Sequence, residues 1–211
     1  MNIVYKNKRE LVKGIIFPED VVLDVGFWGQ GVTVDDENWP HKLLKNRAKD
    51  VYGIDLDFDT TRFDKSKYFK MSAEKFILPV KFDVIFASDL IEHLSNPGLF
   101  LGSCAQHLKS GGKLILTTPN CFNLFNMAEK ITKYEPTVNS DHTCYFNFKT
   151  IEQLFEKNGW IIDARGYVFS LDINYKESLK KKFLNILYYL VSLVTPKFLE
   201  TIVIVAKRNN G

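Results

Sequence analysis

Short β-branched runs alternate with segments of helical spacing along most of this chain, and this alternation constrains its fold more than any other feature. It is typical of a parallel sheet covered by helices on both faces. Runs such as Val84–Phe86 are apolar at consecutive positions, as expected of strands buried on both sides. The predicted strands are Val21–Val25, Val51–Asp55, Tyr68–Met71, Phe82–Ala87, Lys113–Thr118, Ile161–Phe169 and Ile202–Lys207.

These runs predict a doubly wound, Rossmann-like α/β fold with a mostly parallel seven-stranded sheet. The chain has 211 residues, of which 45% are hydrophobic, and this is enough for one substantial core. No repeat or low-complexity linker interrupts it, so we expect a single domain over residues 1–211.

Two helices are bounded by clear sequence signals. Asn96-Pro97 predicts the start of one, and Gly111-Gly112 predicts its end. Thr150 and Gln153 predict a capping box for the other. Two long connections, residues 32–38 and residues 120–147, are expected to shape a substrate pocket, the second with a helix of its own.

Composition narrows the class of protein. The net charge of +3 does not require a polyanionic partner, which makes nucleic acid a less favoured partner without excluding it. Three cysteines without C-x-x-C spacing indicate neither a disulfide framework nor a zinc site, so a reducing cytoplasmic location is expected. The apolar run Phe183–Val194 is shorter than the roughly 20 residues that span a bilayer.

A glycine-rich turn directly follows the first predicted strand. It has the spacing Asp24-x-Gly26-x-x-Gly29-x-Gly31. In doubly wound folds ligands bind at the carboxyl ends of strands, and glycines let the backbone approach a ligand closely. Nicotinamide enzymes place their glycines as G-x-G-x-x-G, the reverse of this spacing, which disfavours a dinucleotide.

The next two strands also end in polar residues. Asp55 could accept hydrogen bonds from both hydroxyls of a ribose. Ser72-Ala73-Glu74 follows the third strand, where an adenine edge would lie. We also count Leu56 and Ser88, at the ends of the second and fourth strands, as candidate cofactor contacts.

Together these motifs resemble the class I S-adenosylmethionine-dependent methyltransferases, and most of all the subgroup that includes the ubiquinone-biosynthesis O-methyltransferases. The matching segments are Val22–Gly26, Val51–Asp55, Ser72–Glu74, Phe82–Leu94 and Leu108–Asn120, followed by Asp141-His142 through Gly159. The resemblance implies that S-adenosylmethionine is the cofactor. By this resemblance its amino-acid part is held by Asp24, Gly26, Gly29 and Gly31, its ribose by Asp55, and its adenine by Ala73 and Glu74.

The chain departs from this family at two places. Phe27-Trp28 puts one residue more than usual between the first two glycines. Ser72 stands where many relatives have aspartate, although its hydroxyl can still bind an adenine amino group.

A second polar group follows the fourth strand. On a helical turn Asp89, Glu92 and His93 would project from one face, and His142 could join them to hold a divalent cation. Some relatives use E-x-x-E-H with a distant histidine in this way; here Asp89 replaces the first glutamate. His93 is the candidate catalytic residue. In the alternative interpretation, Glu92 caps the turn, His93 packs beneath the cofactor and His142 is a surface residue.

The expected function is methyl transfer from S-adenosylmethionine to a hydroxyl of a small molecule, sugar or lipid. Alternatives are an RNA ribose 2′-O-methyltransferase and a non-catalytic S-adenosylmethionine-binding regulator. Residues 176–194, basic and then apolar and aromatic, could contact an anionic membrane surface or form a helix that covers the sheet. His41 and His107 have no partner that the sequence identifies.

Overall fold

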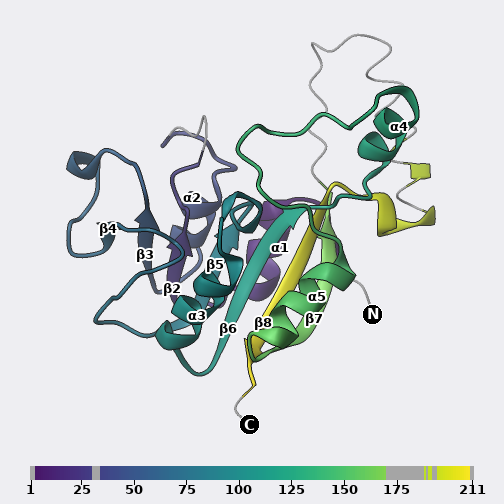
Figure 1. Cartoon of the computed structure of the whole chain (residues 1–211). Helices are drawn as coiled ribbons and strands as arrows, with labels where there is room; N and C mark the ends of the chain where they lie inside the picture. Colours follow the sequence, from purple (N-terminus) through teal and green to yellow (C-terminus); the bar gives the residue numbers. More distant parts are fainter. Residues whose placement is uncertain (1–2, 30–33, 170–187, 189, 192–193, 210–211) are drawn as a thin grey trace.

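An eight-stranded sheet runs through the molecule in the order β1-β7-β8-β6-β5-β2-β3-β4 (Figure 1). The structure is a computed structural model that describes residues 3–29, 34–169, 188, 190–191 and 194–209. The strands are β1 (Ile3–Tyr5), β2 (Val21–Val25), β3 (Asp50–Asp55), β4 (Tyr68–Lys70), β5 (Phe82–Ser88), β6 (Leu108–Pro119), β7 (Trp160–Val168) and β8 (Thr201–Arg208). All seven predicted strands are present. The eighth, β1, was not predicted, because three residues are too few to show a pattern.

The sheet is mostly parallel, as predicted. Among the strands that the structure describes, only β8 runs antiparallel to its neighbours, β6 and β7, and all other pairs are parallel. β2 and β5 lie side by side, although β3 and β4 come between them in the chain. The strand order therefore reverses between β2 and β5, and a crevice opens there at the carboxyl ends of both strands.

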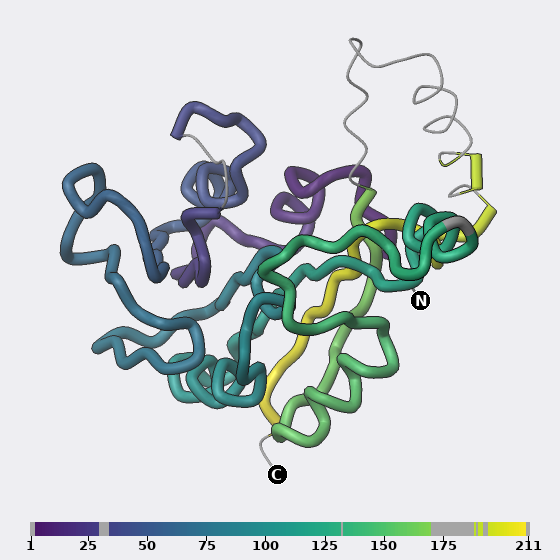
Figure 2. The backbone as a smooth tube through the Cα atoms, turned by 45° about the horizontal axis from the view of Figure 1, so that its top comes forward, coloured from purple at the N-terminus to yellow at the C-terminus, as the bar shows by residue number. Residues whose placement is uncertain are grey.

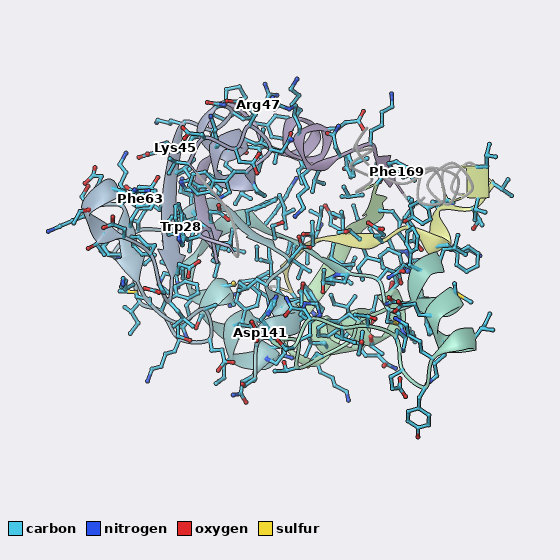
Figure 3. All side chains as sticks on the ribbon, turned by 90° about the horizontal axis from the view of Figure 1, so that it is seen from above. Trp28, Lys45, Arg47, Phe63, Asp141 and Phe169 are labelled. Atoms are coloured by element: carbon cyan, nitrogen blue, oxygen red, sulfur yellow. The ribbon has the colours of Figure 1, made fainter. Side chains whose placement is uncertain are left out.

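Helices cover both faces of the sheet. They are α1 (Lys8–Ile15), α2 (Pro40–Lys45), α3 (Pro97–His107), α4 (Leu124–Thr132) and α5 (Phe148–Lys157), with 3-10 turns η1 (Thr60–Arg62), η2 (Ile91–His93) and η3 (Pro196–Phe198). Seen along the strands, α1 and α2 lie on one side of the sheet and α3 and α5 on the other (Figure 3). Each side has its own apolar core, so the sheet is buried on both faces.

Two predicted helix boundaries were wrong. α3 ends at His107 rather than at Gly111-Gly112, because β6 begins at Leu108 and contains both glycines. Gly111 has φ +76° and lies where the pairing of β6 with β5 shifts register. At α5 the N-cap is Asn147, whose side chain accepts from the Thr150 backbone N–H, so Thr150 is the third helical residue of the box and not its cap.

The connection from β6 to α5 lies beyond the carboxyl ends of the parallel strands. It contains α4, within the predicted excursion of residues 120–147 (Figure 1). Residues 133–147 then return toward α5 across the end of the sheet, where the carboxyl ends of the parallel strands lie (Figure 2). This segment therefore covers the end of the sheet where the crevice opens.

Residues 176–194 are expected either to contact an anionic membrane surface or to form a helix that covers the sheet. Their basic part, residues 176–182, lies outside the described residues, as does most of residues 183–194. No helix in the described ranges combines the length and the apolarity needed to cross a bilayer.

Candidate active site

The glycine turn after β2 is anchored by aromatic packing. Gly26 has φ +73°, and a Cβ on it would lie 2.9 Å from the Leu90 Cδ1 atom. The positive φ therefore favours a glycine there, and a larger residue would be strained. The Phe27 side chain is buried among Trp39, Phe58 and Tyr68, and its carbonyl accepts from the Trp39 indole N–H at 2.8 Å. The Phe27-Trp28 pair makes the turn one residue longer than usual, and Phe27 anchors this longer turn in an aromatic cluster.

The same turn contacts the end of β3. The Trp28 backbone N–H donates to Asp55 Oδ2 at 2.9 Å, and the Asp57 N–H donates to Oδ1 at 3.1 Å. Burial raises the pKa of Asp55. Trp28 lies beside Phe63, with ring centroids 5.7 Å apart (Figure 3). Hydrogen bonds within the chain therefore hold the turn and the candidate ribose residue together.

The other candidate cofactor residues have varied surroundings. Gly29 is exposed, Leu56 is 72% exposed, and Gly31 lies outside the described residues. Ala73 packs into the core. The Glu74 carboxylate accepts from the Asn96 backbone N–H at 2.7 Å at the start of α3, and Ser72 Oγ accepts from the Glu74 N–H. Glu74 thus has a structural contact at the position where the resemblance implies an adenine contact.

One cavity of about 330 Å³ opens at the crevice between β2 and β5. Its lining residues are Lys8, Asp24, Gly26, Phe27, Gly29, Trp39, Pro40, Ser88, Asp89, Glu92, His93, Pro119, Asn139 and His142. The cavity brings the glycine turn and the polar group after β5 to a common space. Asn139 and His142 come from the excursion of residues 120–147, which was predicted to shape the pocket.

Glu92 lies on η2 and is only 2% exposed. Its Oε2 accepts from the Thr118 hydroxyl at 2.9 Å, whereas no group in the described part of the chain bonds to Oε1. Burial raises the pKa of Glu92 to about 7, and the Asp89 carboxylate adds to this shift. A buried carboxylate oxygen without a partner costs stability, which indicates a functional role.

His142 meets His93 across the cavity. Thr143 fixes this contact: its backbone N–H donates to the Glu92 carbonyl at 2.8 Å, and its hydroxyl donates to the Leu94 carbonyl at 2.7 Å. The centroids of the two imidazole rings lie 4.6 Å apart. Burial and the neighbouring His93 lower the pKa of His142. One ligand atom from each of Glu92, His93 and His142 lies within 4.8 Å of the others.

Asp89, the fourth predicted metal ligand, is not part of this group. It has φ +50°, so residues 89–93 do not form the α-helical turn that would align Asp89 with Glu92 and His93. Its carboxylate bonds to the Lys8 ammonium and accepts from the Thr117 hydroxyl. Burial favours a higher pKa for Asp89, but Lys8 and these hydrogen bonds lower it. Ser88 bonds to Thr117 beside it.

Sequence reasoning missed several cavity residues: Lys8, Trp39, Pro40, Pro119 and Asn139. Lys8 begins α1, far from any motif, and only tertiary packing brings it to Asp89. Trp39 could have been predicted, because a tryptophan that follows an unusually long glycine turn in the chain can pack against that turn.

Comparison with known proteins supports the family. A ubiquinone biosynthesis O-methyltransferase of Nitrobacter winogradskyi is 30% identical over 112 residues, which are 45% of this chain and 43% of that protein. The chain thus spans less than half the length of this relative. An S-adenosylmethionine-dependent methyltransferase of Archaeoglobus fulgidus has a TM-score of 0.59 at 20% identity, covering 95% of this chain and 94% of the other.

The magnesium protoporphyrin IX methyltransferase of Synechocystis, solved with bound SAH, has a TM-score of 0.55 at 17% identity over 95% of this chain and 79% of the other. These structural matches show the shared fold. Residues 13–164 match the family model described as a methyltransferase domain. The chain therefore belongs to the class I S-adenosylmethionine-dependent methyltransferase family.

Proposed function

We propose that this protein transfers a methyl group from S-adenosylmethionine to a hydroxyl group of a small-molecule acceptor. One observation carries the proposal: a single cavity is lined on one side by Asp24, Gly26 and Gly29, and on the other by Glu92, His93 and His142. The first set suits the amino-acid part of the cofactor. The second set suits a hydroxyl that must lose its proton.

Of the candidate cofactor residues, Asp24, Gly26, Gly29 and Ser88 line this cavity, whereas Asp55, Leu56 and Ser72–Glu74 do not and are assigned by the family resemblance. Asp24, Gly26 and Gly29 would hold the amino-acid part of S-adenosylmethionine, and the Asp55 carboxylate would accept from the ribose hydroxyls. Leu56 and the segment Ser72–Glu74 would lie toward the adenine, and Ser88 at the cavity wall. S-adenosylmethionine, when bound, supplies a methyl group on a positively charged sulfur.

The contribution of the chain is to orient the acceptor and to receive its proton. Alignment of two reactants can lower a barrier by roughly 7–11 kcal/mol. As the hydroxyl oxygen bonds to the methyl carbon, the carbon–sulfur bond breaks and the hydroxyl proton must leave. Glu92 Oε1 is buried without a partner in the described chain, and His93 lies beside it, so either group can accept that proton.

A divalent cation is a second candidate for this step. The favouring observation is that one carboxylate oxygen and two imidazole nitrogens, from Glu92, His93 and His142, lie within 4.8 Å of one another. This donor set suits a first-row divalent ion, and Glu92 Oε1 has no hydrogen-bond partner in the described chain. A cation bound there would promote loss of the acceptor proton.

The proposal is tested by methyl transfer from radiolabelled S-adenosylmethionine to a panel of phenols, catechols, sugars, polyprenyl phenols and RNA. We expect product from hydroxyl acceptors other than RNA. Glu92→Gln and His93→Gln should reduce kcat while the cofactor Kd stays within about twofold. Cofactor binding without turnover on any acceptor would favour a non-catalytic binder, and labelled RNA would favour the ribose methyltransferase.

The metal is tested separately on the same assay. Activity is measured after EDTA treatment and after return of Mg²⁺, Mn²⁺ or Zn²⁺, with His142→Gln as the matched variant. If the cation takes part, EDTA abolishes turnover and one of these ions restores it. Full activity in EDTA would leave Glu92 and His93 as the proton acceptors.

A further inference from the structure

Three buried side chains from separate elements form a hydrogen-bonded chain behind the cofactor turn. His41, on α2, is fully buried; its Nδ1 lies 2.9 Å from Asp24 Oδ2 and its Nε2 lies 2.8 Å from the Tyr68 hydroxyl. Asp24, at the end of β2, is 2% exposed, and Tyr68, on β4, is also buried. The cavity lining includes Asp24 but not the other two.

The chemistry of the three groups fixes the direction of this chain. Burial and nearby carboxylates raise the pKa of Tyr68 to about 12, so the phenol stays protonated. An ionised Asp24 carboxylate can only accept, so in a neutral imidazole Nε2 is the nitrogen that accepts a hydrogen bond from the Tyr68 hydroxyl. The imidazole then carries its own proton on Nδ1, which donates to the Asp24 carboxylate. In this arrangement both nitrogens of a fully buried histidine are satisfied without a charge on the ring.

Aromatic packing holds the histidine in place. The His41 ring lies 5.0 Å from the Phe27 ring and 5.0 Å from the Trp39 ring, measured between centroids. Phe27 and Trp39 are the residues that anchor the unusually long glycine turn. The aromatic residues that anchor the turn therefore also hold His41, and His41 in turn orients the Asp24 side chain.

We propose that His41 is a positioning residue for cofactor binding: its Nδ1–H holds Asp24 Oδ2, which leaves Oδ1 to accept from the ammonium group of the cofactor's amino-acid part, and Tyr68 fixes the required tautomer. This inference rests on the proposed function, because it assigns Asp24 to the cofactor. No hydrogen bond from the described chain reaches Oδ1, and Asp24 lines the cavity.

The charged groups around Asp24 give the inference a pH signature. Burial raises the pKa of Asp24, whereas His41 on α2 and Lys8 on α1 act in the opposite direction. Asp55 on β3 and Asp89 after β5 also face this region. Only the ionised carboxylate attracts an ammonium group, so affinity falls as the pH drops through the pKa of Asp24. Loss of the His41 hydrogen bond should move this fall to higher pH.

The tautomer is tested without any cofactor. The ¹⁵N NMR spectrum of the whole protein distinguishes an imidazole protonated on Nδ1 from one protonated on Nε2. We expect His41 to be neutral with its proton on Nδ1, and Tyr68→Phe to disturb that state. A neutral His41 with its proton on Nε2 would overturn the proposal whether or not the protein binds S-adenosylmethionine.

Cofactor affinity is measured by calorimetry between pH 5 and 7.5 for His41→Leu, His41→Asn and Tyr68→Phe. Leucine should weaken binding about tenfold or more, because a hydrogen bond to a charged group is lost. Leucine should also move the fall of cofactor affinity at acidic pH to a higher pH. The asparagine Nδ2 can replace the Nδ1 donor, so it should restore part of the affinity and of the wild-type pH profile.

His107 is the matched control. It is also buried, but it bonds to the Leu78 N–H and the Ser103 carbonyl, away from the cavity. His107→Asn should lower Tm without moving the cofactor pH profile. If the His41 variants lose only Tm, as His107→Asn does, His41 is a structural residue and the inference fails. No binding by the wild-type protein would instead refute the proposed function.

Discussion

Glu92 shows at the scale of one residue why this site costs stability. Its carboxylate is almost fully buried and bonds through only one oxygen within the described chain. The pKa is about 7 in the folded protein against an ordinary 4.5, so the folded state holds a proton that the unfolded state releases between these values. Stability linked to Glu92 is therefore fully present below pH 4.5 and is lost as the pH rises to 7.

Replacing Glu92 with glutamine should remove this dependence. The difference between the two pKa values corresponds to roughly 3 kcal/mol. In EDTA, Glu92→Gln should be more stable than wild type by up to this amount at pH 8 and about equal to it at pH 4.5. Urea unfolding at both pH values measures the difference. A variant less stable than wild type at pH 8 would contradict the linkage.

Gly26 and Gly111 offer a matched pair of glycines. Both have positive φ, but a Cβ on Gly26 would meet Leu90 at 2.9 Å, whereas a Cβ on Gly111 would meet nothing within 4 Å. Gly111→Ala should cost about 1 kcal/mol of stability from backbone strain alone. Gly26→Ala should cost more and should also weaken cofactor binding. Calorimetric Kd values and Tm values for both variants separate the two effects; equal Kd values would remove Gly26 from the site.

At the scale of elements, the segment between α4 and α5 decides whether His142 reaches His93. Thr143 ties this segment to η2 through its hydroxyl and backbone N–H. Thr143→Val keeps the shape and removes the hydroxyl, so we expect kcat to fall roughly three- to tenfold with the cofactor Kd unchanged. Thr137→Val, in the same segment but bonded to Glu129 and Lys133 on the surface, is the control. Equal effects of both variants would mean that Thr143 does not position His142.

The elements also show how far sequence patterns reach. β2 begins and ends at the predicted residues, because a buried strand followed by a glycine turn has sharp limits. β6 begins earlier than predicted, because Leu108 pairs with Phe82 on β5 before the glycines interrupt the register. The cap of α5 was assigned to Thr150 instead of Asn147, since both residue types can cap a helix and only the backbone shows which one does.

At the scale of the whole molecule, cofactor binding should stabilise the fold because the cavity joins the ends of two central strands. At 100 times Kd a ligand adds about 2.7 kcal/mol, which raises Tm by roughly 5–10 °C in a chain of this size. Asp55→Asn should abolish most of this rise, since the Asp55 carboxylate binds the turn and, as proposed, the ribose. Asp57→Asn, on an exposed neighbouring side chain, should keep it. A full rise in Asp55→Asn would contradict the ribose assignment.

The sheet, its mostly parallel character and the glycine turn at the end of β2 could be predicted from the residues alone, because they depend on local runs of apolar residues and on glycines close to them in the chain. The sequence also pointed to Glu92, His93 and His142 by residue type. The folded chain shows in addition that these three lie close together while Asp89 pairs with Lys8, and that His41 bonds to Asp24 and Tyr68. These contacts join residues far apart in the chain, so no local pattern records them.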